Sequence, residues 1–299
     1  MVASTIAVTH FTDPGCPWAY SASPDLAVLR WRYGAQLTWR HVMIGLAEDP
    51  QLYLDRGYTP TRMATGYRGF RRYGMPFATA PKPRVGATSP ACRALVATRL
   101  IAPEREEEAF RALQLAQFTS TMLLDEPDAL LAALARVEGL DADAIVGAIE
   151  SPAVRAAYEA DRAESRTAEG GPTHFQGKSA NSDGEERFTA PSLVFTGADG
   201  ASLEAGGFQP VEAYDLCVAN LDRSLERRAP AEDPVAVLRA FAYPLTTREV
   251  SAVMAPPMTA PDDAAAEDAL IAAAGAGVVA RETLGDGALW SLRAAPSAG

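Results

Sequence analysis

The sequence predicts an α/β fold in which a long helical insertion interrupts one small sheet, followed by a small C-terminal domain. Residues 5–12 and 37–44 are apolar, strand-like segments with a helical pattern between them, which is the order of a β-α-β unit. The next strand-like segment begins only at about residue 188. After residue 229, a stretch rich in proline and acidic residues precedes a new series of short elements. We therefore expect two domains, the first of which is discontinuous.

The helices of the insertion are predicted from their apolar spacing. Apolar residues recur at intervals of three and four, as they do along one face of an amphipathic helix. Asp141 and Ser151 are residue types that favour the position before a helix, and Ser151 is followed by a proline. The spacing predicts helices over residues 60–73, 89–100, 104–118, 125–136, 141–150 and 152–167.

The chain is expected to return to the first sheet after the insertion. Residues 168–187 are polar, rich in glycine and without periodicity, which predicts a long return loop. Residues 188–195 and 201–206 are strand-like and flank a Gly-Ala-Asp-Gly turn, so we expect a hairpin. Residues 211–227 then have the pattern of a closing helix.

Cys16 lies at the turn between the first strand and a helix that is expected to continue to Tyr33. Unpaired backbone N–H groups and the positive end of the helix dipole stabilise a thiolate at such a position. We therefore expect Cys16 to be a nucleophile whose pKa lies below that of a free cysteine. A C-x-x-C motif would have a second cysteine three residues later, where this chain has Ala19. The local motif thus contains a single thiol.

The residues around Cys16 resemble the motif D-P-x-C-P-W-C of FrnE-like proteins in the thioredoxin-like DsbA superfamily. Residues 189–195 resemble the cis-proline loop of that superfamily, and residues 206–211 resemble the turn before its last thioredoxin helix. The resemblance covers roughly residues 1–228. The motif residues present in this chain are Asp13, Pro14, Cys16, Pro17 and Trp18, and only the second cysteine is missing.

This resemblance implies a thioredoxin-like fold with a helical insertion, as in DsbA. The thioredoxin-like domain would comprise residues 1–45 and 186–228, and residues 46–185 would form the insertion. The implied catalytic residues are Cys16, Pro17, Trp18 and Pro191.

Further roles follow from the same resemblance. The Ala190–Pro191 bond would be cis and would present a backbone edge beside Cys16, with which a peptide or glutathione backbone could pair. Ala190, Pro191 and Gly207 are therefore the implied substrate- or glutathione-binding residues. Cys92 lies on an insertion helix that is near the cleft in this superfamily. It is either a core residue or a resolving thiol for Cys16.

Three functions are compatible with these motifs. The first is DsbA- or FrnE-like thiol–disulfide exchange or isomerisation through Cys16 alone, with a protein or glutathione as the thiol or disulfide substrate. The alternative is a glutathione-dependent reaction that resembles those of 2-hydroxychromene-2-carboxylate isomerases and kappa-class glutathione transferases. The third is a non-catalytic binding module. We expect no tightly bound cofactor, and glutathione only as a co-substrate.

Composition disfavours several other functions. The net charge of −11 disfavours binding to nucleic acids and anionic membranes, because both attract cationic surfaces. Three cysteines in 299 residues are too few for a disulfide framework and are typical of a reducing compartment. We see no secretory signal and no apolar run of membrane-spanning length, so we expect a cytoplasmic protein. No metal is expected, since the cysteines and histidines lack metal-ligand spacing.

Two features leave alternatives open. His10, near the end of the first strand, could lie within reach of Cys16. A cluster of arginines among aromatic residues is either a solvated helix face or an anion-binding rim of the cleft. Its arginines are Arg62, Arg68, Arg71 and Arg72.

Residues 229–299 predict three short helices and a hairpin, the outline of a winged-helix-like domain. This region has four arginines against nine carboxylates, and its third predicted helix, residues 264–274, lacks basic residues. Phosphates would repel such a surface, so we expect no DNA binding. The alanine-rich helix still needs apolar cover. We therefore expect the whole C-terminal region to pack on the first domain or on the second subunit of a homodimer.

Overall fold

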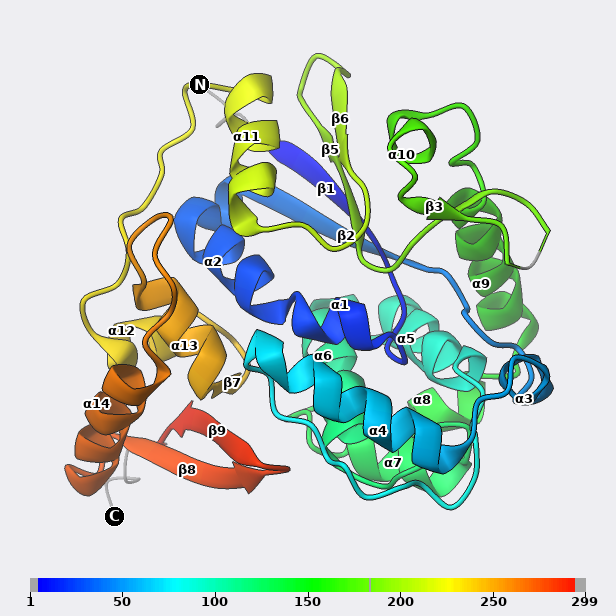
Figure 1. Cartoon of the computed structure of the whole chain (residues 1–299), viewed down its shortest axis with the longest axis horizontal. Coiled ribbons are helices and arrows are strands. Elements are labelled where there is room, and N and C mark those ends of the chain that lie inside the picture. Colours follow the sequence, from blue (N-terminus) through cyan, green and yellow to red (C-terminus); the bar gives the residue numbers. More distant parts are fainter. Residues whose placement is uncertain (1–4, 183, 294–299) are drawn as a thin grey trace.

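The computed structural model describes residues 5–182 and 184–293. Three parts of the chain lie outside the described residues. They are residues 1–4 of the predicted first domain, Asp183 of the predicted return loop and residues 294–299 of the predicted last domain. Strands β1 (Ile6–Thr12), β2 (Leu37–Met43), β5 (Ser192–Thr196) and β6 (Ser202–Ala205) form the main sheet in the order β2-β1-β5-β6 (Figure 1). β1 and β2 are parallel, and the other two pairs are antiparallel.

Helices α2 (Ser23–Tyr33) and α11 (Val211–Leu221) cover one face of this sheet (Figure 1). Val8 and Phe195 of the sheet are fully buried in the same cluster as Leu29 and Tyr214 of the two helices. The thioredoxin-like fold that the sequence implies is therefore present. The closing helix ends at Leu221 and not at residue 227.

The first helix is broken, which the sequence did not predict. Helix α1 (Pro17–Ser21) ends before α2 begins, with Ala22 between them. Pro24 has no N–H to donate to the carbonyl one turn earlier, so the helix cannot continue through it without a break.

The insertion has a hydrophobic core of its own, in which Cys92, Leu95 and Leu113 are fully buried. The helices that the sequence predicts are present with small differences at their ends, and a short helix precedes them. Their bounds are α3 (Gln51–Asp55), α4 (Pro60–Phe70), α5 (Ser89–Ile101), α6 (Glu106–Thr119), α7 (Pro127–Leu134), α8 (Ala142–Ala148) and α9 (Pro152–Ser165), with 3₁₀ turns η2 (Arg71–Tyr73) and η3 (Pro103–Arg105). A further 3₁₀ turn, η1 (Gly34–Gln36), lies outside the insertion between α2 and β2.

The return segment contains more structure than the predicted loop. A short helix, α10 (Pro172–Phe175), is followed by β3 (Ser179–Ala180), which pairs with β4 (Arg187–Phe188). The single strand predicted over residues 188–195 is in fact divided into β4 and β5. Pro191 lies between them and has no N–H for a sheet ladder.

The C-terminal region contains the predicted helices and hairpin. Thr246 and Glu249 form a capping box at the start of the second helix. A short strand, β7 (Leu245–Thr246), pairs with β9 and extends the hairpin to three strands. The other elements are α12 (Pro234–Arg239), α13 (Thr247–Met254), α14 (Asp263–Gly275), β8 (Val279–Leu284) and β9 (Gly287–Leu292).

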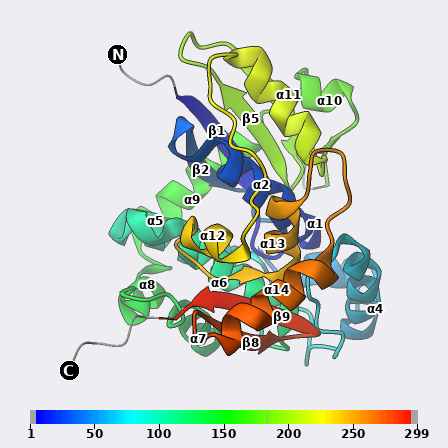
Figure 2. The same ribbon diagram turned by 90° about the vertical axis from the view of Figure 1, so that its left-hand side faces the viewer.

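This region packs against the rest of the chain (Figure 2). Val28 and Trp31 of α2 are buried in one cluster with Val250 of α13 and Trp290 of β9. Leu289 of the hairpin belongs to a second cluster with aromatic residues of the insertion. The expected apolar cover for the C-terminal region is thus supplied within the same chain.

Candidate active site

The turn before α1 holds Cys16 in place through Asp13. The Cys16 N–H donates to the Asp13 carbonyl at 3.0 Å, and the Gly15 N–H donates to the Asp13 carboxylate at 2.7 Å. A Cβ on Gly15 would lie 2.5 Å from Thr88 Cγ2, so only glycine fits at this position. The sequence Asp-Pro-Gly-Cys therefore forms a tight turn against the first helix of the insertion core.

The thiol of Cys16 contacts the predicted cis-proline loop. Its Sγ donates to the Ala190 carbonyl at 3.2 Å, and the Ala190–Pro191 peptide bond is cis. Pro191 is buried and orients Ala190, whose backbone forms the edge beside the thiol. The two motifs that suggested the resemblance thus meet, although 174 positions separate Cys16 from Ala190.

The expected low pKa of Cys16 is wrong for this structure. Burial raises the pKa of Cys16 to about 12, and the negative charge of Asp13 adds to the effect. Backbone N–H groups of Ala19 and Trp18 do act in the expected direction and lower the pKa. Their effect is smaller because the Cys16 residue is only 5% exposed, and desolvation disfavours the charged form. The thiol is consequently protonated at neutral pH in this state.

The carboxylate of Asp13 is fully buried and organises the residues behind Cys16. It accepts hydrogen bonds from the Leu46 N–H at 2.8 Å and the Thr88 hydroxyl at 2.9 Å, and from the thiol of Cys92. Burial raises the pKa of Asp13, and these hydrogen bonds oppose that shift. Asp13 therefore connects the catalytic turn, the end of β2 and helix α5.

The three cysteines are free and occupy different surroundings. Cys92 belongs to the helical core, whereas Cys16 belongs to a cluster with Phe11 and Phe188. Asp13 is their common neighbour, since Cys92 donates to its carboxylate and the Asp13 charge acts on Cys16. Cys217 is half-buried beside the core of the main sheet.

Cys16 opens into a pocket of about 670 Å³ between the catalytic turn, α3, α4 and the cis-proline loop. This size is typical of small-molecule sites. Ala190 and Thr189 form one side, and none of the described residues that line the pocket is Asp or Glu. The lining consists of Gly15, Cys16, Pro17, Trp18, Leu46, Tyr53, Arg56, Tyr58, Arg62, Met63, Thr65, Gly66, Tyr67, Phe70, Arg187, Thr189 and Ala190.

Trp18 is an exposed aromatic wall of this site. Its ring contacts Phe70 of α4 at a centroid distance of 4.9 Å and Phe208 at 5.6 Å. Gly207 precedes Phe208, has a φ of +71° and donates its N–H to Ser192. Gly207 is not among the described residues that line the Cys16 pocket. Its positive φ shapes the turn that carries Phe208 beside Trp18.

Of the four clustered arginines, only Arg62 lines the pocket. Arg71 pairs with Asp286 of the C-terminal hairpin, and Arg72 donates to the hydroxyl of Tyr73. Arg68 is exposed on the same helix. Arg62 is thus the one member of this cluster that an anion in the pocket could contact, and Arg68 lies on the exposed face of the helix.

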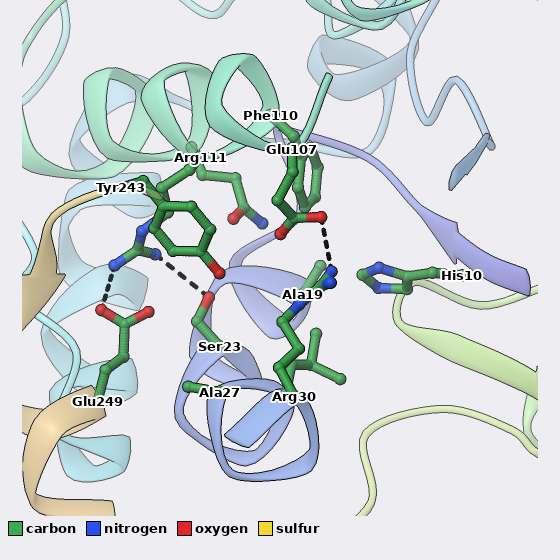
Figure 3. Close-up of a pocket in the computed structure, with 12 residues that line it drawn as sticks. His10, Ala19, Ser23, Ala27, Arg30, Glu107, Phe110, Arg111, Tyr243 and Glu249 are labelled. Carbon is green, nitrogen blue, oxygen red and sulfur yellow. Dashed lines mark hydrogen bonds and ion pairs between the residues drawn. The ribbon is translucent and has the colours of Figure 1, made fainter. Parts of the chain in front are cut away.

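His10 lies in a different pocket from Cys16 (Figure 3). Its ring contacts His41 and Phe110, and neither ring nitrogen has a hydrogen-bond partner among the residues that the structure describes. This small pocket lies between α2, α6 and the C-terminal region, where Arg111 pairs with Glu249. Phe11, the next residue of β1, is buried in the same cluster as Cys16. Because successive side chains of a strand point to opposite faces of the sheet, His10 points away from that cluster, and the expectation that it could reach Cys16 is wrong.

A family model supports the fold. The model for the DSBA-like thioredoxin domain matches residues 7–193. The chain belongs to this family. The matched range includes the catalytic turn, the insertion and the cis-proline loop, but the C-terminal region lies beyond it.

Solved structures of DsbA-like proteins share the fold. A cytosolic disulfide reductase, DsbM from Pseudomonas aeruginosa, is 19% identical with a TM-score of 0.51, over 72% of this chain and 100% of DsbM. A probable DsbA oxidoreductase from Streptomyces coelicolor is 18% identical with a TM-score of 0.53, over 76% of this chain and 93% of the other. A protein taken to be a disulfide isomerase from Nitrosomonas europaea is 20% identical with a TM-score of 0.55, over 72% and 97%. No curated protein sequence matches this chain.

Two negative findings apply to the described ranges. Residues 5–182 and 184–293 contain no helix long and apolar enough to cross a bilayer. Within the same ranges, no three side chains of the His, Cys, Asp and Glu types gather as a metal site would require.

Sequence reasoning missed several residues of the pocket. Tyr53 and Arg56 follow the end of β2, and Arg187 lies on β4. One signal for the first two was available, since segments after the carboxyl ends of neighbouring parallel strands converge at one edge of a sheet. Arg187 had no comparable signal.

Proposed function

We propose that this protein catalyses thiol–disulfide exchange through the single thiol of Cys16. The observation that carries the proposal is the contact between Cys16 Sγ and the Ala190 carbonyl at the mouth of a pocket. A disulfide bound in this pocket would lie beside the thiol, and its backbone could pair with the edge at Ala190. DsbM, which has the same fold, is described as a cytosolic disulfide reductase, which favours this reaction class.

The reaction needs the thiolate of Cys16, so substrate binding has to lower its pKa. The thiol donates to the Ala190 carbonyl, and a hydrogen bond to the neutral form disfavours ionisation. When a substrate N–H donates to the Ala190 carbonyl instead, the hydrogen bond from the Cys16 thiol to this carbonyl is lost. The backbone N–H groups of Trp18 and Ala19 remain directed at the sulfur and stabilise the thiolate.

The single thiol determines the kind of exchange. The Cys16 thiolate attacks one sulfur of the substrate disulfide, a mixed disulfide forms, and the other substrate sulfur leaves as a thiolate. Because position 19 is alanine, a second thiol from outside the motif has to attack the mixed disulfide and regenerate Cys16. We propose glutathione, or a cysteine of the substrate itself, for this step. Disulfide reduction, isomerisation and deglutathionylation can all proceed by these two reaction steps.

The proposal is tested with glutathione disulfide and with insulin whose disulfide bonds are intact. Incubation with glutathione disulfide should produce a mixed disulfide on Cys16, located by peptide mass spectrometry, and added glutathione should remove it. Cys16→Ser should abolish the adduct and turnover, whereas Cys92→Ser keeps the adduct. A longer-lived adduct in Cys92→Ser would support the resolving role of Cys92. Full turnover by Cys16→Ser would disprove the proposal.

The pocket also favours a second candidate, a glutathione-dependent isomerase or transferase for a small organic substrate. Aromatic walls from Trp18, Tyr58 and Phe70 suit a planar substrate better than a protein chain. Insulin reduction with and without glutathione separates the two candidates. Tight binding of glutathione without any disulfide exchange would favour the isomerase, and the absence of both would favour a binding module.

A further inference from the structure

We propose that Arg56 and Arg62 form an anion subsite in the Cys16 pocket, which selects small thiols or disulfides that carry a carboxylate. This inference rests on the proposed function, because it names the substrate class of the same pocket. Both arginines line the pocket, one from just after α3 and one from α4.

The two guanidinium groups are held in place by neutral partners. Arg56 Nη2 donates to the Ser182 carbonyl at 2.9 Å, and Arg62 Nη1 donates to the Gly57 carbonyl at 3.0 Å. Arg62 also lies over the ring of Tyr58, with its Cζ at 5.1 Å from the ring centroid. Carbonyls and a ring position these groups without neutralising their charge.

The charge surroundings distinguish this pair from other arginines of the chain. Exposed arginines such as Arg40 and Arg84 are paired with carboxylates. Among the described residues, no carboxylate pairs with Arg56 or Arg62, and none lines the pocket. In a chain with a net charge of −11, a pocket whose described lining has no carboxylate and includes two such guanidinium groups provides local attraction for anions.

The rest of the pocket limits the substrate to a small molecule with an apolar or aromatic body. Met63 and Phe70 lie on the same helix as Arg62, and Trp18 adjoins Cys16. A carboxylate on the arginines, a ring among these side chains and a sulfur at Cys16 describe one bound ligand. A planar guanidinium suits a carboxylate because it can donate two parallel hydrogen bonds.

The test compares two aromatic disulfides that differ in charge. The reagent 5,5′-dithiobis(2-nitrobenzoate) carries a carboxylate on each ring, and 2,2′-dithiodipyridine is uncharged. Each reacts with the Cys16 thiolate to give a mixed disulfide and one released aromatic thiol, whose absorbance gives the rate. A Cys217→Ser background removes the half-buried second thiol, and Cys16→Ser on that background serves as the blank.

Arg56→Gln and Arg62→Gln should each lower the rate with the carboxylate reagent about fivefold, as expected for a partly exposed ion pair, without changing the rate with the neutral reagent. Arg62→Lys should retain part of the preference. Arg68→Gln is the matched control, since Arg68 is exposed on the same helix but does not line the pocket. Added salt should lower the preference of the unmodified protein for the carboxylate reagent.

The outcomes separate the two proposals. If both reagents react with Cys16 but their rate ratio is the same in all variants, the anion subsite is disproved and the proposed function stands. If Cys16 reacts with neither reagent, the proposed function fails. Equal losses with both reagents would show that the arginines only maintain the pocket, which also contradicts the subsite.

Discussion

The carboxylate of Asp286 accepts a hydrogen bond from the backbone N–H of Phe77 at 2.8 Å. This bond ties the turn of the β8–β9 hairpin to the segment that follows α4. Phe77 is buried in one cluster with Leu289 of the hairpin and with Tyr67 of α4. Tyr67 also lines the Cys16 pocket. The C-terminal region, which lies beyond the family model, therefore supports one wall of the candidate active site.

Leu289→Ala should destabilise the protein by about 2–5 kcal/mol, because it removes a buried side chain from the cluster behind the pocket. Chemical denaturation measures the change. Leu292→Ala, on the same strand but 40% exposed, is the control and should change stability by less than about 1 kcal/mol. Equal effects of the two substitutions would show that the hairpin does not share this core.

The buried ion pair between Arg111 and Glu249 should be costly to break. Figure 3 shows the two side chains of this pair, which are only 5% and 2% exposed. Glu249 also accepts from the Thr246 N–H at 2.8 Å. Arg111→Met should destabilise the protein by about 3–5 kcal/mol, because it leaves a buried carboxylate without a cation. Adding Glu249→Gln should recover much of this loss, since glutamine is neutral and can still accept from Thr246.

A double-mutant cycle followed by urea unfolding measures this coupling. Arg155→Met tests an exposed pair with Glu150 and should cost no more than about 1 kcal/mol. If the double variant is as unstable as Arg111→Met alone, the loss of stability does not come from the unpaired charge of Glu249.

The pH dependence of Cys16 reactivity should follow its raised pKa. The pKa of about 12 leaves very little thiolate at neutral pH, so the rate of alkylation by iodoacetamide should keep increasing as the pH rises above 9. Peptide mapping assigns the label, and the urea-unfolded protein provides the rate of an ordinary cysteine. A rate that levels off below pH 8.5 would show that the helix start outweighs burial.

Ala19→Cys should give the protein a complete C-P-W-C motif. Ala19 is buried, and its N–H is directed at the Cys16 sulfur, so a thiol at this position would start close to Cys16. We expect an intramolecular disulfide, detected as a loss of two thiols, and oxidation of dithiol substrates without glutathione. A disulfide that forms but oxidises no substrate would show that the pocket has diverged from dithiol chemistry.

Asp25 should make the protein less stable at neutral pH. Burial raises its pKa to about 6, so between about pH 4 and 6 the unfolded chain ionises first and stability falls as the pH rises. Asp25→Asn should remove this slope and stabilise the protein at pH 7 by about 1 kcal/mol after allowance for solvent screening. Thermal unfolding at pH 4 and pH 7 measures both effects. A variant that is less stable at pH 7 would contradict the prediction.

Local features of the chain were determined by its sequence. The strand-to-helix turn at Cys16 depends on residues close together in the chain, and its motif indicated it, whereas the cis bond before Pro191 was implied by the resemblance. The capping box at Thr246 also involves neighbouring residues. The order of strands and helices followed from apolar periodicity for the same reason. The break at Pro24 was equally local, and sequence reasoning overlooked it.

Only the tertiary structure decided how the site behaves. The pKa of Cys16 depends on its burial by the cis-proline loop and on the charge of Asp13, and no local pattern gives the balance between desolvation and the N–H groups of the helix start. The pocket likewise combines Arg56, Arg62 and Arg187 from segments far apart in the chain. Burial and charge environment arise from such distant contacts, which is why the sequence identified the nucleophile but not its protonation state.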